Sequence, residues 1–196
     1  GGFPDALRGS FRDWWESYLR TYVERDLPQL HVAADPLLLR RLLTMLAHAQ
    51  GVLLNASQLG QALSVSYHTI TRYLDILEGT FMAWRLRPWH TNLGKREVKA
   101  PKVYLSDSGI LHSLLGIETE AALLAHPKCG ASWEGHAVHE IIRRTGARRD
   151  EVYFWGVHTG AELDMLILRD GRRYGFEVKL TNSPAVTPSM RSAAEV

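Results

Sequence analysis

The chain has 196 residues, of which 45% are hydrophobic and 22% charged, and its formal net charge is only +2. This composition is that of a soluble globular protein, and the charge alone does not indicate a nucleic-acid partner. The apolar runs are shorter than the roughly 18–20 residues that a membrane span needs, so we expect no membrane contact and a cytoplasmic protein. The single cysteine, Cys129, excludes an internal disulfide, in agreement with a reducing compartment.

Two helices are predicted in the first fifty residues. Apolar residues recur at three- and four-residue steps between Phe11 and Leu27, which predicts a helix that ends at Pro28. Asp35 and Pro36 then have the pattern of an N-cap followed by a first-turn proline, and they predict a second, buried helix that runs to Gly51.

A helix-turn-helix pattern follows, with one helix over residues 56–63, a turn at 64–66 and a second helix over 67–78. In the second helix, His68 and Arg72 would face outward, as the contact residues of a recognition helix do. The apolar residues predicted to pack inward are Ile70, Leu74 and Leu77.

Two short strands, over residues 81–86 and 102–105, would form a wing on this motif, with a basic loop between them. Lys95, Arg96 and Lys99 in that loop suit phosphate contacts. Two interpretations remain open for the winged helix. It binds DNA, or it is a scaffold that packs against another protein domain.

The hairpin predicted over residues 160–180 contains the charged residues that indicate a functional site. Asp170-Gly171 favours a two-residue type I′ turn, which pairs Arg169 with Arg172. Counting back from the turn places Asp164 opposite Glu177, and Glu162 opposite Lys179. Two carboxylates so close repel each other unless a cation lies between them, so the pair predicts a divalent metal site.

Side-chain alternation also predicts which face of the hairpin is buried. The residues assigned to the core face are Ala161, Leu163, Met165, Ile167, Tyr174, Phe176, Val178 and Leu180. Leu166 and Leu168 share the charged face, and an aromatic run at residues 153–155 predicts a third strand nearby. The alternative to a metal site is a solvated amphipathic hairpin with a cross-strand ion pair.

The order of these acidic and basic residues is specific. Glu134 lies on a predicted helix over residues 132–145, Asp164 on a strand, and Glu177-Val178-Lys179 on the next strand. This pattern resembles that of the PD-(D/E)xK nuclease superfamily. Four further segments, at residues 1–4, 18–27, 69–74 and 99–104, resemble the DUF4143 region of prokaryotic AAA-type ATPases. The resemblance extends over nearly the whole chain.

The resemblance implies an α+β fold. Residues 1–115 would form a helical and winged-helix module, and residues 116–196 a restriction-endonuclease-like α/β module that is cut short at Val196. It also implies an N-terminal P-loop ATPase module in the full-length protein as a partner. Gly94-Lys95-Arg96 lacks the remaining residues of a Walker A motif, so we expect no ATP site in this chain.

The resemblance further implies that Asp164 and Glu177, completed by Glu134, hold Mg²⁺ or Mn²⁺, and that Lys179 positions or activates the attacking water. These four residues are the predicted catalytic set of a phosphodiesterase that acts on nucleic acid, a hydrolase. The competing interpretation is a non-catalytic regulatory or docking module that contacts the ATPase domain or DNA. The oligomeric state and the type of nucleic acid stay open.

Overall fold

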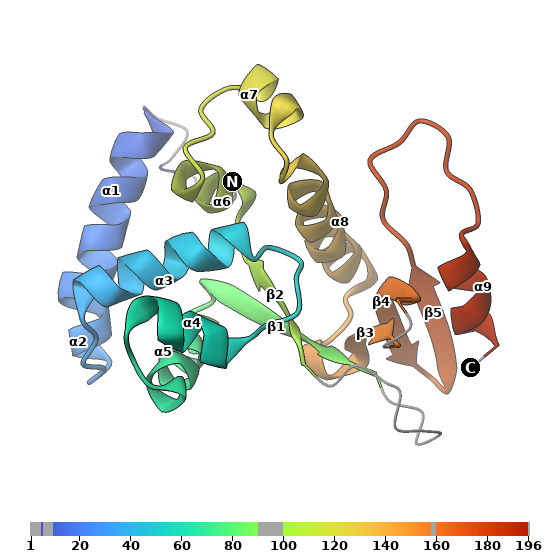
Figure 1. The fold of residues 1–196 in the computed structure, drawn as a ribbon, viewed down its shortest axis with the longest axis horizontal. Coiled ribbons are helices and arrows are strands. Elements are labelled where there is room, and N and C mark those ends of the chain that lie inside the picture. Colours follow the sequence, from blue (N-terminus) through green and yellow to red (C-terminus); the bar gives the residue numbers. More distant parts are fainter. Residues whose placement is uncertain (1–4, 6–9, 90–99, 158–159, 196) are drawn as a thin grey trace.

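The computed structural model of the chain describes residues 5, 10–89, 100–157 and 160–195. A five-stranded sheet with helices around it forms the α+β fold (Figure 1), and its strand order is β2-β1-β3-β4-β5. The strands are β1 Ala83–Pro88, β2 Lys102–Leu105, β3 Val152–Gly156, β4 Glu162–Arg169 and β5 Arg172–Phe176. Only β1 and β3 run parallel; the other neighbouring pairs are antiparallel. The sheet therefore joins strands from both sides of residue 115.

The N-terminal helices follow the apolar periodicity of the sequence. α1 (Phe11–Thr21) continues through a π-helical turn at Tyr22–Asp26 into the short α2 (Leu27–Gln29). The helix ends one residue beyond the predicted Pro28, because a proline is tolerated in the first turn of α2. α3 (Pro36–His48) begins as predicted, with the Asp35 carboxylate accepting two backbone N–H bonds at 2.8 and 3.2 Å.

The predicted helix pair is confirmed as α4 (Ala56–Leu63) and α5 (Tyr67–Gly79). Ser64 ends α4 in the left-handed region, and the Ser66 hydroxyl caps α5. His68 and Arg72 are exposed as predicted. The inward residues Ile70, Leu74 and Leu77 are buried and join the larger hydrophobic core between α1, α3 and α5.

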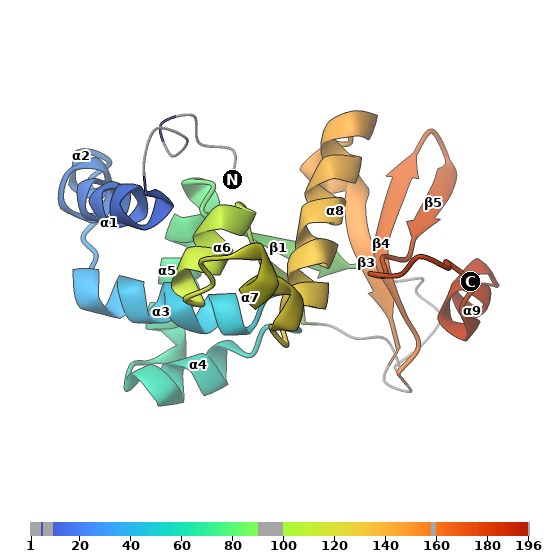
Figure 2. The same cartoon turned by 90° about the horizontal axis from the view of Figure 1, so that it is seen from above.

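The remaining helices are α6 (Ser108–Leu114), α7 (Glu120–Ala125), α8 (Cys129–Thr145), a 3-10 turn at Arg149–Glu151 and α9 (Pro188–Ala194). Figure 2 shows α8 and α9 on opposite sides of the β3–β5 part of the sheet. Val138 of α8 shares a core with Met165 and Ile167 of β4, whereas Leu163 and Leu166 of β4 pack against α9. Of the helices in the described ranges, none is both long and apolar enough to cross a membrane.

The hairpin turn is confirmed, but its strands are shorter than predicted. Asp170 and Gly171 both have positive φ, 52° and 70°, as a type I′ turn requires. The register from Arg169–Arg172 to Met165–Phe176 is also as predicted. β5 then leaves the sheet after Phe176, so the expected pairs of Asp164 with Glu177, and of Glu162 with Lys179, do not form in the ladder.

A β-bulge corrects the predicted faces of β4. Tyr153 pairs with Leu166 and Trp155 pairs with Leu163, so two residues of β4, Asp164 and Met165, lie opposite Phe154 alone. An extra residue in one strand interrupts the alternation and redirects side chains. Leu163 therefore lies on the α9 face, and Asp164 joins Met165 on the α8 face. Tyr174 and Leu180, also assigned to the core, are exposed.

Candidate active site

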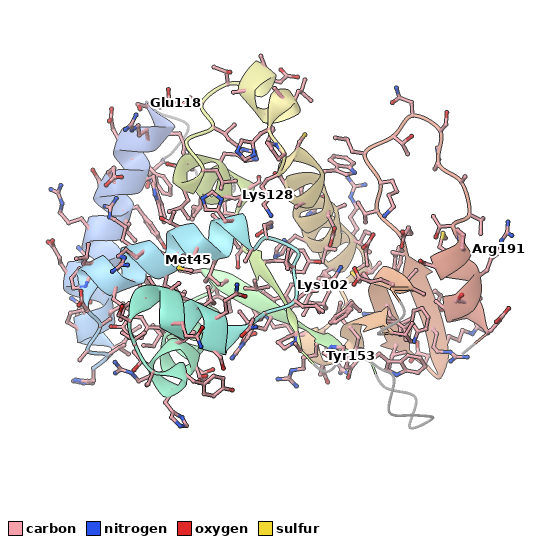
Figure 3. The ribbon with its side chains drawn as sticks, in the orientation of Figure 1. Met45, Lys102, Glu118, Lys128, Tyr153 and Arg191 are labelled. Atoms are coloured by element: carbon pink, nitrogen blue, oxygen red, sulfur yellow. The ribbon has the colours of Figure 1, made fainter. Side chains whose placement is uncertain are left out.

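A buried lysine at the start of β2 lies at the centre of an acidic cluster between α8 and the sheet (Figure 3). The Lys102 Nζ is 2.5 Å from the Glu162 Oε1, 3.3 Å from the Glu134 Oε1 and 3.6 Å from the Asp164 Oδ1. Its side chain is only 3% exposed. One ammonium group therefore compensates three carboxylates that come from α8 and β4.

Strand geometry explains how Lys102 reaches the cluster. Side chains two residues apart in a strand share a face, so Lys102 and Tyr104 both point toward α8. The Lys102 ammonium lies 5.6 Å from the centre of the Phe154 ring, and the Tyr104 hydroxyl donates to the Glu134 Oε1 at 2.5 Å. Glu134 is thus fixed by two residues of β2.

Burial and neighbouring charges have opposite effects on the pKa values of Lys102 and Glu134. Burial by itself lowers the pKa of Lys102, but Glu134, Glu162 and Asp164 together raise it above its ordinary value. Burial raises the pKa of the Glu134 carboxyl, against the opposing effects of Lys102 and the Tyr104 hydroxyl. Lys102 therefore carries its charge at neutral pH, whereas at Glu134 burial outweighs the attraction of Lys102 and leaves the pKa of this carboxyl above its ordinary value.

The second half of the predicted site lies in the segment that follows β5. The Val178 N–H donates to the Asp164 Oδ2 at 2.8 Å, which ties this segment to the bulge. The Lys179 ammonium is 2.9 Å from the Glu177 Oε1, and this contact raises the pKa of Lys179. Lys179 is 57% exposed, whereas Glu177 is nearly buried. The Glu177 Oε2 is buried and has no hydrogen-bond partner in the described parts of the chain.

The carboxylate oxygens and the net charge of these residues suit a divalent cation. Mg²⁺ and Mn²⁺ prefer carboxylate and carbonyl oxygens, and the Glu177 Oε2 is a buried carboxylate oxygen without a partner. When all are ionised, Glu134, Glu162, Asp164 and Glu177 carry four negative charges against two positive charges on Lys102 and Lys179. These six side chains together have the formal charge that one divalent cation neutralises. Among the described residues, no three or more acidic, histidine or cysteine side chains are already arranged around one metal position.

Glu134 and Asp164 thus both contact Lys102, and the bond from the Val178 N–H places the segment that carries Glu177 and Lys179 beside Asp164. The sequence prediction missed the roles of Lys102 and Glu162. Lys102 was predicted to begin the strand over residues 102–105, and its place in an apolar strand was a signal that its side chain could be buried.

The predicted nucleic-acid contacts lie elsewhere. Figure 1 shows α5, which carries His68 and Arg72, packed beside α3 and α4 and away from β4 and β5. The Arg72 guanidinium donates to the Ala33 carbonyl at 3.3 Å and lies 5.2 Å from the centre of the Tyr73 ring. The expected contacts at Lys95, Arg96 and Lys99, and the Gly94-Lys95-Arg96 segment, fall outside the described residues.

Comparison with known families divides the chain at the start of α8. Residues 1–121 match the family model of DUF8612, a domain of unknown function, and this is more than half of the chain. The chain belongs to the DUF8612 family. Residues 129–195 match DUF4143, also a domain of unknown function. The DUF4143 resemblance is therefore confirmed for this part of the chain, whereas the first part, for which we expected the same family, matches DUF8612.

Two curated relatives are uncharacterized proteins of Mycobacterium bovis and Mycobacterium tuberculosis, each 40% identical over 197 residues. These alignments cover 98% of this chain and 44% of each relative. The chain therefore spans less than half the length of the curated relatives it matches.

The candidate site combines residues of both family segments. Lys102 and Tyr104 lie in the DUF8612 segment, whereas Glu134, Glu162 and Asp164 lie in the DUF4143 segment. The acidic cluster therefore depends on how α8 packs on β2.

Gly135 allows this close packing, so Gly135→Ala is expected to lower the free energy of unfolding by about 1–3 kcal/mol. A Cβ at this position would overlap the Gln50 amide nitrogen and lie 3.3 Å from the Tyr104 ring. Gln50 is buried and its Oε1 accepts the Leu105 N–H at 2.8 Å, so it cannot move without losing that bond. Urea unfolding measures the change.

Gly130→Ala, in the same helix, is the matched control, since nothing lies within 4 Å of a Cβ there. We expect this variant to be as stable as the wild type or up to about 1 kcal/mol more stable. Equal effects of the two substitutions would contradict the close approach of α8 to Gln50.

Proposed function

We propose that the acidic cluster around Lys102 is the site of a divalent-metal-dependent phosphodiesterase that acts on nucleic acid. The observation that carries the proposal is the buried Glu177 Oε2, which has no partner in the described parts of the chain. A buried carboxylate oxygen without a partner is costly, and a bound cation would remove that cost. The excess of two negative charges over the six residues Glu134, Glu162, Asp164, Glu177, Lys102 and Lys179 supports the same assignment.

Each residue has a role that follows from its position. Asp164, Glu177 and Glu134 would hold Mg²⁺ or Mn²⁺, and the cation would stabilise the negative charge that develops on the phosphate oxygens. Lys102 is buried and holds Glu134 and Asp164 in place. Lys179 is exposed, so its ammonium would reach the phosphate or the attacking water while Glu177 anchors it.

We also propose that the chain is the C-terminal part of a cytoplasmic AAA-type ATPase. The curated relatives are more than twice as long as the matched segment, which leaves room for a P-loop ATPase module in the full-length protein. The α4–α5 pair and the β1–β2 hairpin would then form a winged helix that contacts DNA or the ATPase module.

A cleavage assay with Lys179→Met tests the proposed hydrolysis. Single-stranded and double-stranded DNA and RNA are incubated with the protein, with and without Mn²⁺ or Mg²⁺. We expect metal-dependent cleavage that falls by about 100-fold or more in the variant, because a charge that stabilises the transition state is removed. Lys128→Met, the same chemical change in another described lysine, should cleave as the wild type does. No cleavage by the wild type, or equal rates in both variants, would contradict the proposal.

A second candidate function, a non-catalytic docking module, is favoured by one observation. The Lys102 ammonium already compensates Glu134, Glu162 and Asp164 through its own contacts, as in a purely structural ion network. Under this alternative, Mn²⁺ leaves the thermal midpoint of the wild type unchanged. Any DNA affinity then falls with salt, survives Asp164→Asn and decreases when Lys95 and Arg96 are neutralised.

A further inference from the structure

A cavity of about 220 Å³ lies beside the C-terminal half of α8 and outside the acidic cluster. It is formed where the start of β1 and the residue before it, the residue after β2, the helix α8 and the 3-10 turn at Arg149–Glu151 meet. Its lining residues are Phe81, Trp84, Ser106, His139, Ile142 and Arg149. The wall is mainly aromatic, with one cation and two hydrogen-bonding side chains.

Phe81 is exposed to solvent, and its backbone has an unfavourable conformation. Its side chain is 71% exposed, and its φ of 60° lies in the left-handed region, which bulky residues rarely adopt. The next residue, Met82, is buried, and its N–H donates to the Leu77 carbonyl. The Phe81 N–H also donates to the Glu78 carbonyl, so the left-handed φ belongs to the end of α5, and this turn leaves the Phe81 ring at the surface.

Arg149 adds a positive charge beside this ring. Its guanidinium lies 5.3 Å from the centre of the Phe81 ring, and Arg149 is exposed. Within the part of the chain that the structure describes, Arg149 forms no ion pair, whereas Arg143, Arg144 and Arg148 each contact a carboxylate. Its charge is thus available to a ligand that enters the cavity.

The inner wall offers hydrogen bonds. Trp84 is 5% exposed, and its ring lies 5.8 Å from that of His139. The His139 Nδ1 is 2.8 Å from the Gly135 carbonyl, so this nitrogen carries the proton and the Nε2 of the neutral ring is an acceptor. Burial lowers the pKa of His139 and keeps the ring neutral at pH 7. The Ser106 hydroxyl both donates and accepts.

We propose that this cavity binds a nucleobase of a single-stranded nucleic acid, with Phe81 as the stacking surface and Arg149 at the phosphate. Flat aromatic walls, edge hydrogen bonds and an arginine are the features that recognise unpaired bases. The class of ligand rests on the proposed function. His139 follows Glu134 by five residues, or about 7.5 Å along the helix axis, so the cavity and the acidic cluster lie less than two turns apart along α8.

Fluorescence anisotropy with a short labelled single-stranded oligonucleotide tests this proposal, in the presence of EDTA so that cleavage plays no part. Its abasic counterpart, with the same number of phosphates, reports phosphate contacts alone. We expect Phe81→Asn to weaken binding of the base-containing strand about tenfold and to leave the abasic strand unaffected. Asparagine accepts the left-handed conformation, so the thermal midpoint should not fall. Leu124→Asn, another exposed hydrophobic residue, should bind both strands as the wild type does.

Equal affinity of the wild type for the two strands, or equal affinity of the two variants for the base-containing strand, would overturn the proposal. Adenosine monophosphate should compete only weakly, since it offers a single phosphate. Displacement of the strand by an equal concentration of this nucleotide would reassign the cavity to a free nucleotide. The anisotropy assay contains no metal and therefore measures binding alone. If the oligonucleotide binds in that assay but is not cleaved in the separate nuclease assay, the proposed hydrolysis is rejected and the proposed cavity is not.

Discussion

Lys102→Met is expected to lower the free energy of unfolding by about 3–5 kcal/mol, as removal of one partner from a buried ion pair does. The substitution keeps an unbranched side chain of similar length but removes the ammonium from among Glu134, Glu162 and Asp164. The remaining carboxylates then repel one another, and Glu134 and Asp164 do so with little solvent to screen them. Urea unfolding monitored by circular dichroism measures the loss.

The design of this experiment separates charge from packing. Lys128→Met is the control, because the same change outside the cluster should alter stability by less than about 0.5 kcal/mol. Adding Glu134→Gln to Lys102→Met should restore part of the lost stability, since it removes one uncompensated charge. If Lys102→Met unfolds at the same urea concentration as Lys128→Met, the ammonium does not organise the cluster.

Asp164→Asn is expected to reduce metal-dependent cleavage by about 100-fold or more while changing stability by less than about 1 kcal/mol. The amide keeps an oxygen that accepts the Val178 N–H, and Lys102 keeps its contacts with Glu134 and Glu162. Loss of attraction to Lys102 and relief of repulsion among the carboxylates oppose each other. The variant should therefore remain folded and lose the charge that would hold the cation.

Cleavage rates and the thermal midpoint of the same preparation check this prediction. Asp150→Asn is the matched control, since the Asp150 side chain is 75% exposed and lies outside the cluster. A folded Asp164→Asn variant that cleaves at the wild-type rate would remove Asp164 from the site. An unfolded variant would instead show that the contact with Lys102 outweighs the repulsion.

Local signals predicted most of the elements. The Asp35 cap, the left-handed Asp170-Gly171 turn and the helices α4 and α5 each depend on a few neighbouring residues, so they could be read from short stretches of sequence. The bulge at Asp164 could not, because it appears only when β4 is paired with β3. The end of β5 at Phe176 was not visible either, because the next four residues, 177–180, continue the alternation of polar and apolar side chains.

The candidate site, too, could be predicted from the sequence only in part. The types and order of Glu134, Asp164, Glu177 and Lys179 were visible in the sequence. The link between them was not, since Lys102 is 32 residues from Glu134 in the chain and reaches it only through the sheet. A basic residue in a cluster of basic residues is ordinarily solvated. The apolar residues that follow Lys102 were a local signal of burial, but they do not show which carboxylates it contacts.

Calorimetric titration of Mn²⁺ into the protein and into its Asp164→Asn variant tests the central claim most directly. We predict that the wild type binds one ion per chain and that the variant binds none, with both proteins folded by circular dichroism. Absence of binding to the wild type, or the same isotherm for both proteins, would contradict a metal site at Asp164.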